Sequence, residues 1–135
     1  MSKTLEIRKC IKQIIEECGC KAYYEKANKV VAFPYAVFEF NMMDISDNVK
    51  RELEVTIDIW DKSEESSAIE QITDNIVEAL NHRLKFLNGR SLRIYGIRRR
   101  SLTDEDETLK RRQVECLVVY FDRRDKKWQS QAKQM

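Results

Sequence analysis

The sequence is poor in residues on which several kinds of active site depend. Its three glycines, Gly19, Gly89 and Gly96, are isolated from one another, which excludes a glycine-rich phosphate-binding loop. The one histidine, His82, falls late in a predicted helix, where an exposed surface imidazole is a better interpretation than a catalytic base. No apolar run reaches the roughly 18 residues of a membrane span, and the first ten residues lack a signal peptide's apolar core. We therefore expect a cytosol-like compartment and no membrane partner.

The cysteines and the acidic residues predict little metal chemistry. Without an export signal, Cys10, Cys18, Cys20 and Cys116 are expected to be small, buried, reduced thiols. A zinc site at Cys18-Gly19-Cys20 would need ligands from elsewhere, and because the chain has a single histidine we do not expect one. Asp58, Asp61, Glu64 and Glu65 form an acidic cluster that suits a divalent cation in a metal-dependent hydrolase, but acidic residues ahead of a helix also complement its dipole. We favour the helix interpretation and expect no catalytic residue, no metal and no cofactor.

Size and charge favour one small domain with local charge effects. At 135 residues the chain has the length of a single domain, which we place at residues 1–135. Charged residues make up 36% of it, above the roughly 25% that is usual. Lys and Arg number 25 against 23 Asp and Glu, a net charge of +2. The molecule as a whole is therefore not predicted to bind polyanions.

Hydrophobic periodicity predicts two helices and four strands. Apolar residues at helical spacing mark a helix over residues 5–18, ended by Gly19 and followed by a basic loop. A second helix is predicted from an N-cap at Ser67 to about Leu87, with Asn88-Gly89 as its stop. Alternating or apolar runs predict strands at residues 35–41, 53–60, 91–97 and 113–121.

This order of elements defines the expected fold. Helix, strand, strand, helix, strand, strand predicts an α+β domain with a mostly antiparallel four-stranded sheet and two helices on one face. The last strand is apolar on both faces toward its end, which predicts a central position. Residues 122–135 form a basic C-terminal tail that we expect to be partly frayed beyond Trp128.

A long charged connection is predicted between the third and fourth strands, over residues 98–112. It carries six basic and four acidic residues, with the basic ones at its two feet and the acidic ones at its tip. We expect an exposed hairpin extension or a flexible loop that serves as a subunit or partner interface. A solvated face and a nucleic-acid contact are the other interpretations. The candidate interface residues are Arg98, Arg99, Arg100, Asp104, Glu105, Asp106, Glu107, Arg111 and Arg112.

Three segments together resemble a known family. They are PYAVFEF at 34–40, LEVTIDIWDKS at 53–63 and AIEQITDNIVEAL at 68–80. The combination is similar to the small tail completion, or tail terminator, proteins of long-tailed bacteriophages and prophages. In that family a strand led by Pro-Tyr pairs with a strand that ends in Ile-Trp plus Ser, and a helix rich in Ile, Ala and Leu follows. The resemblance covers about residues 30–100.

The resemblance implies a structural role in the virion tail or neck. Such a protein is not an enzyme: it caps the growing tail tube as a ring, expected to be a hexamer, and helps to join tail to head. Its implied partners are further copies of itself, the tail-tube protein and the head-tail connector proteins, with DNA passing through the channel without sequence recognition. Assembly is expected in the bacterial host cytoplasm. The alternative is a nucleic-acid-binding α+β module that uses residues 98–112.

Overall fold

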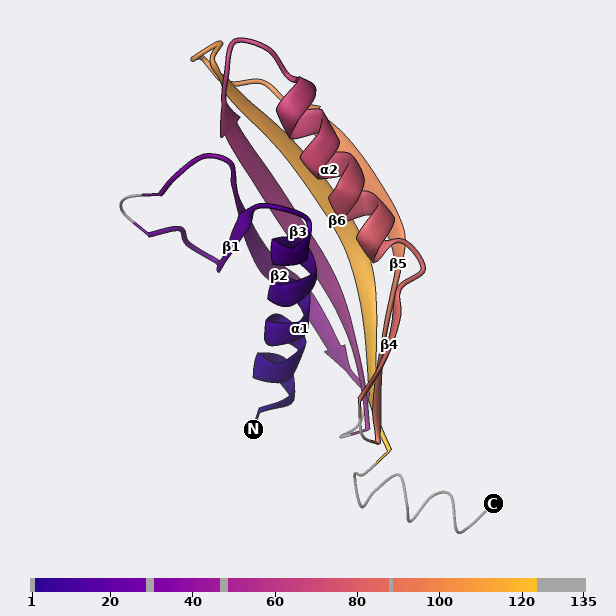
Figure 1. The fold of residues 1–135 in the computed structure, drawn as a ribbon. Coiled ribbons are helices and arrows are strands. Elements are labelled where there is room, and N and C mark those ends of the chain that lie inside the picture. The colour runs from indigo at the N-terminus through magenta and orange to yellow at the C-terminus, as the bar shows by residue number, and fades with distance from the viewer. Residues whose placement is uncertain (1, 29–30, 47–48, 88, 124–135) are drawn as a thin grey trace, which may run out of the picture.

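The computed structural model describes residues 2–28, 31–46, 49–87 and 89–123 (Figure 1). Within these ranges the helices are α1 (Lys3–Glu17) and α2 (Ser67–Leu80). The strands are β1 (Lys21–Tyr24), β2 (Tyr35–Ile45), β3 (Lys50–Lys62), β4 (Leu84–Leu87), β5 (Arg90–Leu102) and β6 (Leu109–Asp122). All of the strands belong to one sheet in the order β1-β2-β3-β6-β5-β4.

The α+β class is confirmed, but the prediction of a four-stranded sheet is wrong. The described sheet has six strands, because a short strand is added at each edge. β1, which lies in the segment expected to be a basic loop, pairs in parallel with the start of β2. β4 pairs antiparallel with the start of β5. The remaining neighbours are antiparallel as expected, and β6 is central, between β3 and β5.

The second helix is shorter than predicted because part of it is a strand. α2 ends at Leu80, and His82 follows in the left-handed conformation at φ 55°, so the histidine is in a turn and not on a helix. Leu84, expected on the buried helical stripe, lies on β4 and is 52% exposed. The spacing of leucines at 80, 84 and 87 fits a helix, but pairing with β5 determines the structure. Asn88, part of the predicted stop, lies outside the described residues.

The start of α2 also differs by one residue. Its N-cap is Ser66, whose side chain makes no capping hydrogen bond, and Ser67 is already helical. The backbone N–H of Ser67 donates to the Glu65 carboxylate at 3.1 Å, and its hydroxyl donates to the same carboxylate. These bonds lower the pKa of Glu65. The acidic side chain before the helix thus satisfies a free N–H, as the helix interpretation of this cluster predicts.

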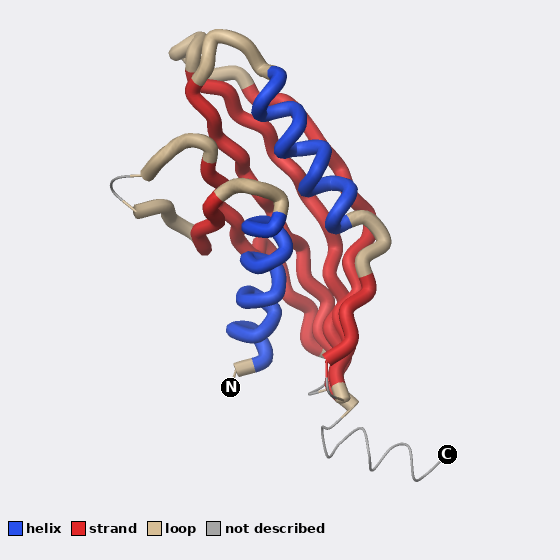
Figure 2. Tube along the Cα trace, in the orientation of Figure 1, coloured by secondary structure: helices blue, strands red, loops and turns tan. Residues whose placement is uncertain are grey.

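Both helices cover the same face of the sheet, as predicted (Figure 2). Alternate residues of β6 point toward them: Tyr120 contacts α1 and Arg112 contacts α2. The core lies between the two layers, and its fully buried members include Ile7, Ile11, Phe38, Val55, Ile57, Ile59, Ile76, Leu92, Ile94, Val114 and Val118. The opposite face of the sheet, which we call the open face, is covered by neither of the described helices. Residues 124–135, which contain most of the predicted basic tail, lie outside the described residues.

Candidate interface

Most of the charged segment is regular strand. Residues 98–102 complete β5 and residues 109–112 begin β6, so the connection itself is only residues 103–108. The predicted long connection between the third and fourth strands is therefore wrong, and the hairpin alternative is right. From the sequence, the third strand was predicted to end before residue 98 and the fourth to begin after residue 112, because charged residues are as typical of an exposed strand end as of a loop. Here the arginines stand on a sheet, where alternation sends neighbours to opposite faces.

A bulge in β5 decides which arginine faces which side. Tyr95 pairs with Leu117 and Arg98 pairs with Glu115, so two residues of β5 lie opposite one residue of β6. Gly96 sits in this bulge at φ 65°, a conformation that favours glycine. A β-carbon on Gly96 would lie 3.2 Å from the Leu117 side chain. The extra residue reverses the alternation of β5 after Gly96, so each following arginine faces the side of the sheet opposite to the one it would face without the bulge.

Arg99 and Arg112 lie under α2. Arg99 bonds the carboxylates of Glu70 and Asp74, and the Nε of Arg112 bonds the other oxygen of Glu70. The Arg112 side chain is only 12% exposed. These two arginines therefore hold the helix to the β5–β6 hairpin, which is an internal role.

Arg100 and Arg111 lie on the open face, also with partners. The Nε of Arg100 donates to the Gln113 amide oxygen at 2.6 Å, and a terminal nitrogen donates to Glu115 at 3.2 Å. Arg111 donates to Asp58 at 3.0 Å and stacks over the Trp60 ring at 4.6 Å. Both guanidinium groups are engaged within the chain.

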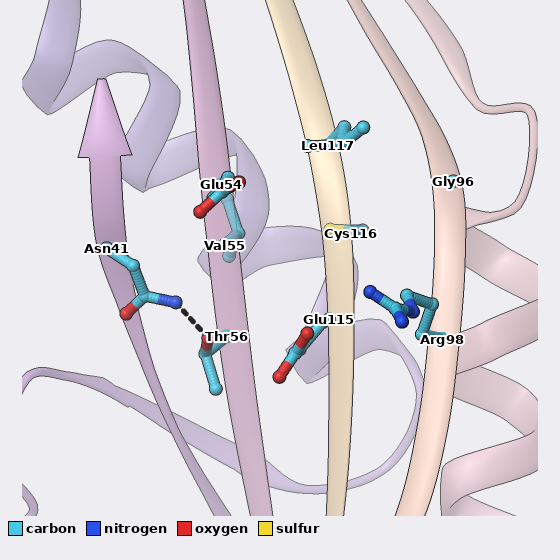
Figure 3. A pocket seen from close by; sticks show the side chains of 9 residues that line it. All are labelled: Asn41, Glu54, Val55, Thr56, Gly96, Arg98, Glu115, Cys116 and Leu117. Atoms are coloured by element: carbon cyan, nitrogen blue, oxygen red, sulfur yellow. Dashed lines mark hydrogen bonds between the residues drawn. The ribbon is translucent and has the colours of Figure 1, made fainter. Parts of the chain in front are cut away.

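Arg98 differs from the others. It is exposed, and its side chain forms no hydrogen bond or ion pair with another part of the chain that the structure describes. Its side chain leans over a hollow on the open face, with a volume of about 320 Å³, whose other lining includes Asn41, Glu54, Thr56, Glu115 and Leu117 (Figure 3). The hollow crosses β2, β3, β6 and β5 and holds a donor, Arg98, near two carboxylates. It is a polar depression suited to a side chain of a partner surface.

The acidic tip closes its own turn. Asp106 accepts bonds from the backbone N–H and hydroxyl of Thr108, which lower the pKa of this carboxyl, and Asp104 accepts from the N–H of Asp106. In the described structure Asp104, Glu105, Asp106 and Glu107 form no ion pair with the hairpin arginines. Within the described chain the tip therefore does not neutralise the hairpin arginines. The carboxylates that do so come from β3, α2 and β6.

The acidic cluster of the hydrolase interpretation is divided between faces. Asp58 points to the open face and contacts Arg111, whereas Asp61 is buried on the other face and bonds the backbone N–H of Lys62 at 2.9 Å. Glu65 caps α2. Among the residues that are described, no group of three or more candidate side chains is placed to hold a metal ion. The four cysteines are free, and Cys10, Cys20 and Cys116 are buried.

Sequence reasoning missed part of the exposed surface. Phe86 is 75% exposed and Leu84 52% exposed, on the open-face side of β4 beside β5. Met42, 56% exposed, and Leu117, 37% exposed, continue the apolar area across β2 and β6. The exposure of Leu84 and Phe86 was not predicted because residues 84–87 were assigned to a helix. The available signal for Leu117 was that residues 113–121 are apolar on both faces toward their end, which was interpreted as the mark of a central strand.

Comparison with known proteins gives a family and a fold. Residues 11–120 match the family described as tail completion protein gp17. A chain in a solved structure titled "Virion of native gene transfer agent (GTA) particle" superimposes with a TM-score of 0.53 at 12% sequence identity, over 82% of this chain and 84% of that one. At that identity the likeness shows the fold alone. A search of curated proteins gave no match.

Proposed function

Because this chain belongs to the family of tail completion protein gp17, a family of structural phage tail proteins, we propose that it caps the tail tube as a ring and ends the growth of the tube. The match over residues 11–120 carries the proposal, since it spans nearly all of the helices and strands described. The family agrees with the resemblance seen in residues 34–40, 53–63 and 68–80.

The proposed assembly is a ring with two different contact surfaces. Six copies form the ring, one surface of which contacts the tail-tube protein and the other the head-tail connector proteins, in the tail or neck of the virion. DNA passes through the channel without sequence recognition. An uncovered sheet face with apolar residues supports a chain that completes its packing by assembly. Within the described residues no helix is long and apolar enough to cross a membrane.

The test is control of tube length. The tail-tube protein encoded with this chain is polymerised in vitro, with and without a stoichiometric excess of the chain, and tube lengths are measured by negative-stain electron microscopy. We expect shorter tubes that carry a ring at one end. The matched control is tube protein incubated with an unrelated small protein of similar charge. An unchanged length distribution and bare tube ends would overturn the proposal.

The nucleic-acid alternative is weakened by the pairing of the arginines. Arg99, Arg100, Arg111 and Arg112 are each bonded to side chains of the same chain, and they point to two faces of the sheet. Phosphate binding by all of them would require these contacts to break.

A further inference from the structure

Both edges of the sheet are only partly covered. β1 pairs with β2 at Tyr35–Phe38, and the Glu25 N–H bonds the Phe38 carbonyl at 2.8 Å, after which the outer side of β2 has no strand partner in the described chain. β4 pairs with β5 at Arg90–Arg93, and the Ile94 N–H bonds the Arg83 carbonyl at 2.8 Å. Residues 39–45 and 95–102 therefore pair with a neighbouring strand on one side, whereas on the other side no described strand pairs with their backbone. Such edges are templates for another strand.

The two open edges carry opposite charge. The β2 edge, residues 39–45, contains Glu39 and Asp44 and no basic residue, and we call it the acidic edge. The β5 edge, residues 95–102, contains three arginines and no acidic residue, and we call it the basic edge. Glu39, Asp44 and Arg98 are exposed, and within the described parts of the chain none forms an ion pair. Pairing of either edge with its own kind would oppose like charges, whereas acidic with basic edge pairs opposite ones.

Strand directions permit this pairing. β2, β3, β6 and β5 are adjacent and alternate in direction, so β2 and β5 run antiparallel. A second copy added by rotation about an axis to which the strands are tilted places its β2 beside the first copy's β5. The two meet antiparallel, which continues the alternation of the sheet without interruption.

The acidic edge and the basic edge are also offset from each other along the strand direction, as a closed sheet requires. Phe40–Ile45 of β2 lie level with residues 51–55 of β3 and 116–120 of β6. The basic edge from Arg98 to Leu102 lies level with Glu115–Arg111, at the other end of β6. Bringing the edges together therefore staggers each copy along the strand direction. Closing strands into a barrel requires such a tilt and stagger.

We propose that a second copy of this chain is the partner of each edge: the acidic edge of one copy adds to the basic edge of the next. The contact is heterologous, since different surfaces meet, and repeated rotation closes it into a ring. This inference rests on the proposed ring and names the residues that build it. Arg98, whose side chain has no partner among the described residues, then meets an acidic side chain of the neighbouring copy.

Charge reversal provides the test. Arg98→Glu places a negative charge on the basic edge, which then repels Asp44 of the neighbouring copy. Asp44→Arg places a positive charge on the acidic edge, which then repels Arg98 of the neighbouring copy. Each variant alone is expected to lose self-association by about tenfold or more in sedimentation velocity, because like charges then face each other. An equal mixture of the two variants restores assembly, since in an alternating ring every contact again joins opposite charges. That recovery requires position 44 of one copy to face position 98 of another, and the mass of the restored oligomer distinguishes a ring from a dimer.

A charge reversal away from the edges is the control. Lys12→Glu, an exposed charge reversal on α1 away from both edges, leaves assembly unchanged, and circular dichroism shows that all variants are folded. A wild-type chain that stays monomeric at the highest attainable concentration, oligomers that tolerate both reversals, or a mixture that fails to recover overturns the edge pairing. Oligomers that tolerate the reversals while the wild type still limits tube length would overturn the edge pairing alone. Unchanged tube length, whatever the oligomeric state, overturns the proposed function.

Discussion

Tyr120 and Glu6 connect the central strand to the first helix through a partly buried hydrogen bond. The Tyr120 side chain is fully buried, and its hydroxyl donates to the Glu6 carboxylate at 2.8 Å. The same carboxylate binds Arg90 of β5 and lies in the first turn of α1, where the helix dipole favours negative charge. Three elements therefore meet at one acidic side chain.

We expect Tyr120→Phe to lower the free energy of unfolding by about 1–2 kcal/mol, since a hydrogen bond to a charged group is lost and part of the carboxylate loses its partner. Urea denaturation measures the change. The control is Tyr95→Phe: Tyr95 is half-buried on the open face, and its hydroxyl makes no hydrogen bond to the described residues, so that change is expected to stay within about 0.5 kcal/mol. Equal losses in the two variants would contradict the role given to the bond.

Cys116 predicts a loss of stability in alkali. Burial raises the pKa of this thiol from 9.0 to about 12, and its side chain is 3% exposed. Below pH 9 the thiol is protonated in both states; above it the unfolded chain releases the proton and the folded chain does not, so stability falls as pH rises from 9 to 12. At pH 10 the loss is about 1.4 kcal/mol. Cys116→Ala is expected to lose that much less between pH 8 and pH 10 in urea denaturation, and an identical drop in both proteins would refute this.

The faces of residues within strands were predictable, but their partners were not. Alternation places Leu53, Val55, Ile57 and Ile59 on one side of β3, and all four are buried there. The same rule applied to residues 98–100 required the bulge at Gly96, which no local pattern specifies. Because the arginines were assigned to a connection, as a hairpin extension or a loop, with no register to its neighbours, their division between α2 and the open face was outside what the sequence could predict.

At the scale of elements, α2 is held to the hairpin by charge as well as by its apolar stripe. Glu70 accepts from both Arg99 and Arg112, while Ile69, Ile76 and Leu80 are buried beneath the helix. The Glu70 side chain is 42% exposed, so solvent screens the pairs and their contribution is modest.

Glu70→Gln is expected to cost about 0.5–1 kcal/mol of unfolding free energy at low salt, and less at high salt, because the pairs are screened. Thermal or urea unfolding at two ionic strengths measures this. Glu78→Gln is the matched control, since Glu78 is exposed on the same helix and forms no ion pair in the portion described. A cost independent of salt, or the same cost at Glu78, would show that the charge pairs do not hold the helix.

Element boundaries were predicted well where hydrophobic period and end signals agree. The first helix, expected at residues 5–18, is Lys3–Glu17, and Gly19 follows it at φ 103°. β4 and β1 were missed because each is four residues long, too short for a period to be read. Both exist through pairing with a longer neighbour, which is a tertiary effect.

For the whole molecule, the sequence was sufficient for the class and the family but not for the surfaces. The order of long elements predicts an α+β domain, and the segments at 34–40, 53–63 and 68–80 predict the family that the match over residues 11–120 shows. The open edges follow from how far β1 and β4 extend, so they become visible only when the sheet is assembled. Surface charge alone cannot distinguish an arginine bonded within the chain from one that is available to a partner.

That distinction gives a prediction for DNA. Each phosphate contact contributes about 0.9 to the slope of log affinity against log salt for duplex DNA. Arg98 has no internal partner among the described residues, so Arg98→Ala is expected to reduce the slope by about one, if the chain binds duplex at all. Arg111→Ala is expected to leave it unchanged because Arg111 is bonded to Asp58. Fluorescence anisotropy with a labelled duplex measures both slopes. Equal reductions in both would show that the internal pairs open to phosphates, as a nucleic-acid-binding module requires, and no binding at low salt would remove that alternative.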